Sequence, residues 1–188
     1  MSRSLRGTSG ADLSDDCPCF PQLPHYALRL FVKPPTGHLQ LGMELGIHPM
    51  LDRLDLIRCE DTDTARFLYP RHHLNPFDYP AADEFATAPA CTKIEIVMSD
   101  EYECGTVICQ SGITVRQVLK HVLEYWNAPV TDDVADEVRK EFDLRTDYPI
   151  KKRTWNNWKE FDLYDGWKYA KVQADGVTVL LASTRFYR

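Results

Sequence analysis

The sequence predicts an α+β fold: a mainly antiparallel sheet with two consecutive helices packed on one face, after a loop-rich N-terminal half. Residues 93–110 contain two runs of strand pattern, residues 115–142 place apolar side chains at helical spacing, and residues 167–182 alternate again. Strands, then helices, then a hairpin is the order typical of helices segregated to one face of an antiparallel sheet.

Composition and charge are those of an ordinary globular protein. Hydrophobic residues make up 44% of the 188 residues and charged residues 27%, and the formal net charge is −6. This acidic balance argues against a surface built to neutralise phosphates, so nucleic acid is not the expected partner. Residues 1–16 lack the apolar segment of a signal peptide, and no run of 18 apolar residues occurs. We therefore expect a cytoplasmic protein with no membrane partner.

The N-terminal half is expected to consist largely of loops. Residues 1–24 contain few apolar side chains, which predicts a mobile tail before a single domain of residues 25–188. Short strands are expected at residues 26–32, as an added edge strand, and at residues 39–47, which could pair with it. Five prolines in residues 48–89 argue against long helices there.

A strand pair is predicted after Pro89. Ile94, Ile96 and Met98 alternate with more polar neighbours, which is the period of two that a half-buried strand shows. Residues 102–110 are expected to form the neighbouring strand of a hairpin.

Thr114 is predicted to begin the first helix. Gln117 completes a Thr-x-x-Gln capping box, in which each side chain satisfies a backbone donor of the first turn. Pro129 ends the helix. The apolar stripe expected to pack on the sheet is Val115, Val118, Leu119, Val122, Leu123 and Trp126.

Thr131 is predicted to begin the second helix, with two aspartates in the favourable first turn. Val134, Val138 and Phe142 fall at i, i+4 and i+8 and are expected to share its buried face. The helix should end near residues 144–148.

The last predicted unit is a hairpin. Residues 167–172 and 177–182 form two short strands, and the Asp-Gly pair at residues 175–176 is the strongest hairpin signal in the chain, because glycine tolerates the positive φ of tight turns.

Several short segments stand out by their order and spacing. They are Ile47–Leu51, Ala86–Ala90, Gly112–Leu119, Ala128–Thr131, Asp175–Val177 and Leu180–Phe186. Together they resemble a family from mushroom-forming fungi that is catalogued as a domain of unknown function, over roughly residues 47–187. Gln117 stands where that family often has an acidic residue, and residues 187–188 replace its usual small-residue exit. The resemblance implies a fungal, intracellular setting and supplies no catalytic residues.

Residues 151–159 have the most unusual local composition, because two tryptophans stand among lysines and an arginine. Tryptophan rings stack on bases or sugars, while basic groups neutralise acids. Alternatively, the two tryptophans, three positions apart, anchor a short helical turn on the core, and the acidic residues that follow favour this structural interpretation. A ligand groove near this segment is still the best candidate site. Its predicted binding residues are Lys152, Arg153, Trp155, Trp158 and Trp167.

Other candidate groups favour structural interpretations. His72 and His73 could supply a base, but adjacent residues of a strand point to opposite faces and do not easily share one metal. His48 and His121 are expected to be structural. The sequence predicts neither a metal nor a cofactor, because Cys17 and Cys19 lack a second ligand pair and the acidic cluster at residues 60–63 lacks the spacing of a calcium loop.

The cysteines are expected to be reduced thiols, since the chain is long and poor in cysteine. Cys104 and Cys109 fall in the predicted strand pair, where burial would raise their pKa values and lower their reactivity.

These observations predict a non-catalytic binding domain for a protein partner or a small apolar ligand. Catalytic residues are unknown, because no nucleophile elbow, phosphate loop or zinc-protease motif occurs. The alternative is an enzyme of fungal specialised metabolism that uses general acid–base chemistry on an apolar substrate, with His72, His73 or Asp165 in a cavity. A second alternative is nucleic-acid binding through residues 151–159, with steep salt dependence. An exposed apolar patch would favour protein binding.

Overall fold

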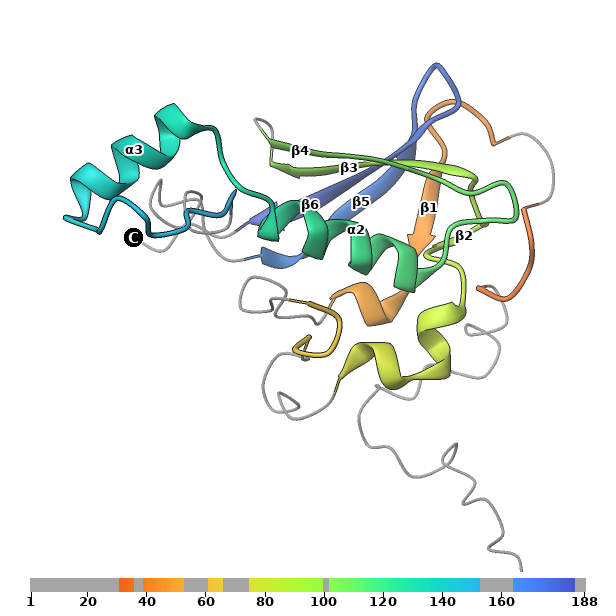
Figure 1. The fold of residues 1–188 in the computed structure, drawn as a ribbon. Helices are drawn as coiled ribbons and strands as arrows, with labels where there is room; N and C mark the ends of the chain where they lie inside the picture. Colours follow the sequence, from red (N-terminus) through yellow and green to blue (C-terminus); the bar gives the residue numbers. More distant parts are fainter. Residues whose placement is uncertain are drawn as a thin grey trace, which may run out of the picture.

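The computed structural model describes residues 31–35, 39–52, 61–65, 75–99, 102–152 and 164–184. The expected tail at residues 1–24 and most of the expected strand at residues 26–32 lie outside this part of the chain. Figure 1 shows a curled sheet with helix α2 (Val115–Asn127) across one face and helix α3 (Asp132–Glu141) beyond its end. The strands are β1 (Glu44–Ile47), β2 (Thr87–Ala88), β3 (Lys93–Ser99), β4 (Tyr102–Ile108), β5 (Tyr164–Val172) and β6 (Thr178–Thr184).

The six strands form one sheet in the order β2-β1-β5-β6-β3-β4. Every neighbouring pair is antiparallel except β3 and β6, which run parallel from Ile94↔Thr178 to Val97↔Leu181. The predicted α+β fold with a mainly antiparallel sheet is therefore confirmed. Strand β6 lies between β5 and β3, so it joins the two halves of the sheet.

The β3–β4 hairpin follows the predicted alternation. Ile94 and Ile96 are fully buried. The register shifts after Ile96, close to Gly105, whose φ is 99°. His121 of α2 lies over this irregularity and makes a 2.8 Å hydrogen bond from its Nε2 to the carbonyl oxygen of Cys104, so its expected structural role is supported.

Helix α2 is built as its sequence predicts. The Thr114 hydroxyl accepts a hydrogen bond from the Gln117 backbone N–H, and the Gln117 side chain accepts one from the Thr114 N–H. This box stabilises the first turn by about 1 kcal/mol. All six predicted stripe residues are buried, in one cluster with the inner face of the sheet. Burial of each such side chain stabilises the fold by about 1.5–3 kcal/mol.

The described parts of the N-terminal half contain short single-turn helices, as the prolines predict. They are η1 (Pro49–Asp52), η2 (Pro76–Asp78) and η3 (Pro80–Asp83). Buried His48 holds the entry to η1: its Nδ1 accepts a hydrogen bond from the Met50 N–H at 3.1 Å, which leaves Nε2–H to donate to Glu84 at 3.1 Å. This pairing fits the expected structural role of His48.

The expected strand at residues 39–47 is only partly correct. Residues 44–47 form β1, but Leu41 and Gly42 turn, with φ of 77° at Gly42. The Gly42 N–H donates to the carbonyl of Val172, so the segment joins β5. Phe31 and Val32 also lie in a turn, where the sequence predicts the end of a strand.

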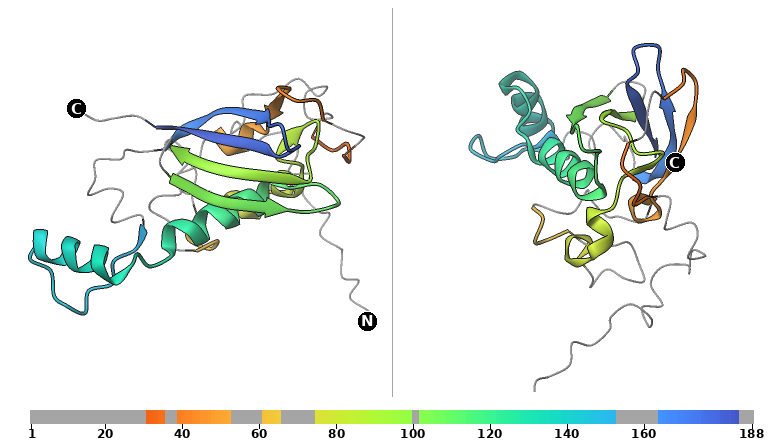
Figure 2. Two further views of the ribbon diagram at one scale, coloured as in Figure 1. Left: turned by 90° about the horizontal axis from the view of Figure 1, so that it is seen from above. Right: turned by 90° about the vertical axis from the view of Figure 1, so that its right-hand side faces the viewer.

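Helix α3 packs differently from α2. Its buried residues Ala135 and Val138 form a second, smaller cluster with Ile150. Figures 1 and 2 show α3 and the segment that follows it projecting beyond the sheet. A bridge between Pro129 and Lys151 closes the base of this unit. Residues 130–150 are called the arm below.

The prediction for Phe142 is wrong, because its side chain is 52% exposed. Residue 142 is the C-cap of α3, and Asp143 follows with a φ of 49°, so the chain leaves the helix before Phe142 can join the buried face.

The last hairpin is confirmed. Gly176 has a φ of 78°, Gln173 and Val177 are joined by a 2.8 Å hydrogen bond, and the Asp175 carboxylate accepts a bond from the Val177 N–H. Among the described helices, none has the length and apolar character needed to cross a membrane.

Candidate functional site

The structure describes two of the five predicted ligand-binding residues. Trp155, Trp158 and Arg153 lie outside the described residues. Trp167 is in β5, is only 8% exposed and belongs to the main core cluster, so little of its ring is accessible to a ligand. The ammonium of Lys152 lies 4.1 Å from the centre of the Tyr125 ring, a cation–π contact at the end of α2.

Other candidates from the sequence also fall outside the description. They are His72, His73, Cys17, Cys19 and Glu60. Asp165 is a residue of strand β5. Among the residues that are described, no group of three or more His, Cys, Asp or Glu side chains could hold a metal ion.

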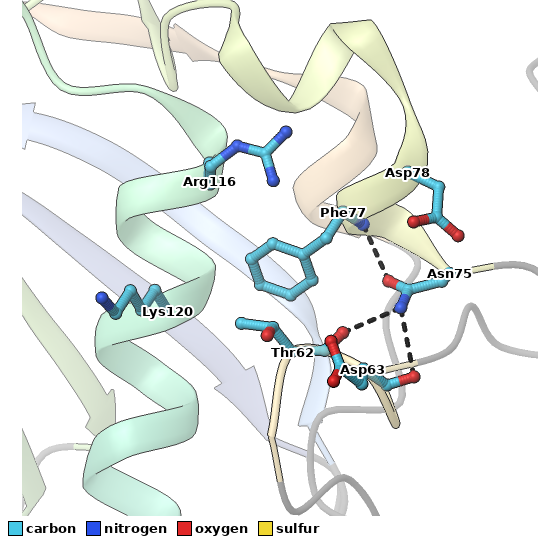
Figure 3. Close-up of a pocket in the computed structure, with 7 residues that line it drawn as sticks. All are labelled: Thr62, Asp63, Asn75, Phe77, Asp78, Arg116 and Lys120. Atoms are coloured by element: carbon cyan, nitrogen blue, oxygen red, sulfur yellow. Dashed lines mark hydrogen bonds between the residues drawn. The ribbon is translucent and has the colours of Figure 1, made fainter.

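A pocket of about 370 Å³ lies between α2, η2 and residues 61–65 (Figure 3). Phe77 points from η2 toward α2 and forms its apolar wall. The other lining residues are polar, which suits a polar molecule better than the apolar ligand expected from the sequence. They are Thr62, Asp63, Asn75, Asp78, Arg116 and Lys120.

Asn75 connects the two loop walls of this pocket. Its Nδ2 donates to the carbonyl oxygens of Thr62 at 2.8 Å and Asp63 at 3.2 Å, while its Oδ1 accepts from the Phe77 N–H at 2.9 Å. The Asn75 amide therefore caps η2 and fixes residues 61–65 against it.

The cations on the α2 wall are already paired. Arg116 makes a two-pronged contact with Asp83, at 2.6 Å and 3.2 Å, and its guanidinium lies 5.7 Å from the Phe77 ring centre. The hydrogen bond from Arg116 lowers the pKa of the Asp83 carboxyl. Lys120 lies 3.8 Å from Glu124. The described lining residues offer carboxylate, amide, hydroxyl and cationic groups that can hold a polar molecule.

Sequence reasoning singled out only Asp63 among these lining residues. The others come from three separate segments, and no spacing in the sequence shows that Phe77 and Arg116 face each other.

The described cysteines fall into two classes. Cys91 and Cys104 are buried, and burial raises the pKa of each thiol. The sequence predicted that burial would also raise the pKa of Cys109. This prediction is wrong, because β4 ends at Ile108 and Cys109 lies half-buried in the following turn. The Ser111 hydroxyl, 3.2 Å from its sulfur, and the Gln117 side chain lower the pKa of Cys109.

We expect Cys109 to react with iodoacetamide faster than Cys91 or Cys104 in the folded protein. A lowered pKa gives more thiolate at any pH below it, so labelling of Cys109 should begin at lower pH. Timed labelling followed by peptide mass spectrometry measures the three rates. Ser111→Ala should slow Cys109 alone; labelling of Cys104 as fast as that of Cys109 would contradict the assignment.

The arm carries the second candidate surface. Phe142 and Tyr148 are 52% and 49% exposed. Arg139 holds the returning segment to α3, because its Nε donates to the Tyr148 carbonyl at 3.0 Å while its Nη1 donates to the Asp136 carboxylate at 2.9 Å. Both aromatic rings are thus attached to an ordered frame, although the sequence predicted that Phe142 would be buried.

Comparisons of this chain with known protein families, with curated proteins and with solved structures found no match. The resemblance to the fungal family stays a prediction.

Proposed function

We propose that this protein is a non-catalytic binding domain that docks onto another protein through its arm. The observation that carries the proposal is the exposure of Phe142 and Tyr148 on a unit that projects beyond the sheet. Exposed aromatic side chains on an ordered unit are available to a protein partner, and aromatic residues are enriched at the core of protein interfaces.

The arm has the properties of a pre-organised docking element. The cluster of Ala135, Val138 and Ile150 and the Arg139 contacts order it before binding, which reduces the entropy lost in a complex. Large aromatic side chains are the residue types that most often dominate binding energy at interfaces.

The arm supports protein binding better than the alternatives. The alternative of nucleic-acid binding concerns residues 151–159, most of which lie outside the described residues, whereas the acidic side chains of the arm itself would repel phosphates. The pocket beside α2 is polar, whereas the proposed enzyme would need a cavity for an apolar substrate. We also propose a cytoplasmic setting, in keeping with the free thiols of Cys91, Cys104 and Cys109.

The test is capture from an extract of the source cells with the immobilised full chain and two matched variants. Phe142→Ser/Tyr148→Ser removes the arm's exposed rings. Val32→Ser/Leu41→Ser removes two exposed apolar side chains elsewhere, which are 58% and 71% exposed. We expect a set of proteins that binds wild type and the control but not the arm variant, with similar melting temperatures for all three. Equal capture by both variants, or no capture by wild type, would overturn the proposal.

A further inference from the structure

We propose that the pocket between α2, η2 and residues 61–65 binds one uncharged sugar ring. This site is separate from the arm, and the inference does not depend on the proposed function. A sugar ring has hydroxyl groups around its edge, which both donate and accept hydrogen bonds, and apolar C–H groups on its faces. The pocket offers donors, acceptors and an aromatic ring to match them. Its volume of about 370 Å³ is near the lower end of the range for ligand sites, which suits a single ring.

Arg116 supplies hydrogen-bond donors on the α2 wall. A guanidinium carries five N–H groups. Within the described part of the chain, Nε and Nη2 each donate once to the Asp83 carboxylate, at 2.6 Å and 3.2 Å. Three N–H groups are left for a ligand, and the contact with Asp83 fixes the orientation of the planar guanidinium. Figure 3 shows the guanidinium on the same side of α2 as the Phe77 ring.

Asp78 supplies acceptors on the opposite wall, in η2. Its side chain is exposed, and among the described residues its carboxylate accepts no hydrogen bond and joins no salt bridge. The two oxygens can therefore accept from two neighbouring hydroxyl groups of a sugar. The hydrogen bond to Asp83, followed by the negative charge of Asp78, raises the pKa of Arg116, so Asp78 and Arg116 are close enough to act on one ligand.

The Phe77 ring supplies the apolar surface between these polar walls. It points from η2 toward α2 and is only half-buried, so part of the ring is accessible (Figure 3). The negative face of an aromatic ring attracts C–H groups, such as those on the face of a sugar. Asn75 holds this surface in place, because it accepts a hydrogen bond from the Phe77 N–H and donates to the carbonyls of Thr62 and Asp63. Such pre-organisation reduces the entropy lost on binding.

The charges around the pocket favour a neutral ligand. Two carboxylates and two cations line it, and they balance. Three further carboxylates lie beside it, so the surroundings are negative and would repel an anion. A cation would be repelled by the Arg116 guanidinium beside Phe77, whereas hydroxyl groups can bond to charges of either sign. The lining charges are Asp63, Asp78, Arg116 and Lys120, and the three neighbouring carboxylates are Asp61, Asp83 and Glu124.

The test is an NMR titration of the isotope-labelled full chain with D-glucose, D-galactose, D-mannose and N-acetyl-D-glucosamine. We expect at least one of these sugars to cause saturable amide shifts at residues 62–63, 75–78 and 116–120, at millimolar concentration. Saturation transfer from the protein should be strongest at the C–H protons of one face of the sugar. The affinity should not change with salt, because the ligand has no charge to screen. Methylammonium chloride and sodium phosphate, the charged probes, should bind there more weakly.

Asp78→Ala should weaken the binding of that sugar about tenfold, the effect of losing hydrogen bonds to a charged group. Phe77→Leu keeps an apolar side chain but removes the flat ring, and it should weaken binding about fivefold. The matched control is Asp132→Ala, which removes an exposed carboxylate of α3 outside the pocket and should leave the affinity unchanged. Asp78 is exposed, so its variant should keep the melting temperature of wild type.

Four results would overturn the inference. They are the absence of saturable shifts with all four sugars, shifts that lie mainly outside the pocket, tighter binding of either charged probe, and equal affinity of Asp78→Ala and Asp132→Ala. None of them bears on the capture experiment, because that experiment changes residues of the arm only and a separate surface control.

Discussion

Leu119→Ala is expected to lower the free energy of unfolding by about 2–4 kcal/mol. Leu119 is fully buried on the stripe of α2, and its truncation removes apolar contacts and leaves a cavity against the sheet. Urea denaturation of the full chain measures the change. Lys120→Ala, on the exposed side of the same helix, is the control and should change stability by less than about 0.5 kcal/mol. An unchanged midpoint for Leu119→Ala would show that the stripe is not the core.

Gly112→Ala is expected to cost about 2–4 kcal/mol, from two separate causes. The φ of Gly112 is 105°, which strains any residue with a Cβ, and the new Cβ would clash with the ring of Phe85. Gly176→Ala separates these causes, because Gly176 has a φ of 78° but nothing within 4 Å of an added Cβ. That control should cost about 1–2 kcal/mol, the backbone strain alone.

A double-mutant cycle with Phe85→Ala isolates the steric part. If the Phe85 ring causes the extra loss, Gly112→Ala should cost no more in the Phe85→Ala background than Gly176→Ala costs in wild type. An unchanged cost in that background would show that the ring is not responsible. Chemical denaturation of wild type, the two single variants and the double variant measures the cycle.

Local signals predicted the regular part of the fold correctly. The capping box at Thr114, the stripe of α2 and the Asp-Gly turn at residues 175–176 each depend on a few neighbouring residues. Their physics is short-range, so the sequence is sufficient to locate them.

Features that depend on contacts between distant parts of the chain could not be predicted from the sequence. Parallel pairing of β3 with β6 joins segments more than 80 residues apart, and no periodicity encodes it. The i, i+4, i+8 pattern of α3 correctly indicated a helix, but the pattern does not say which surface the helix packs on. Ile150 supplies that surface, and Phe142 is left exposed.

The candidate surfaces also divide into features that the local sequence reveals and features that depend on tertiary contacts. Tryptophan and lysine content directed attention to residues 151–159, whereas the described structure buries Trp167 in the core. The acidity of the arm is visible in the sequence, but only the structure shows that α3 projects beyond the sheet and that Arg139 and Arg145 pair with Asp136 and Asp147. The pocket beside α2 depends wholly on tertiary contacts.

The position of β6 has a consequence for synthesis on the ribosome. The β3–β4 hairpin and the β1–β5 pair are linked in the sheet through β6, which is made after all of them. Without β6, β3 and β5 have no partner between them in the sheet, and their facing hydrogen-bonding edges stay open. Open edges of this kind favour aggregation, so we expect the nascent polypeptide to become safe from it when β6 pairs.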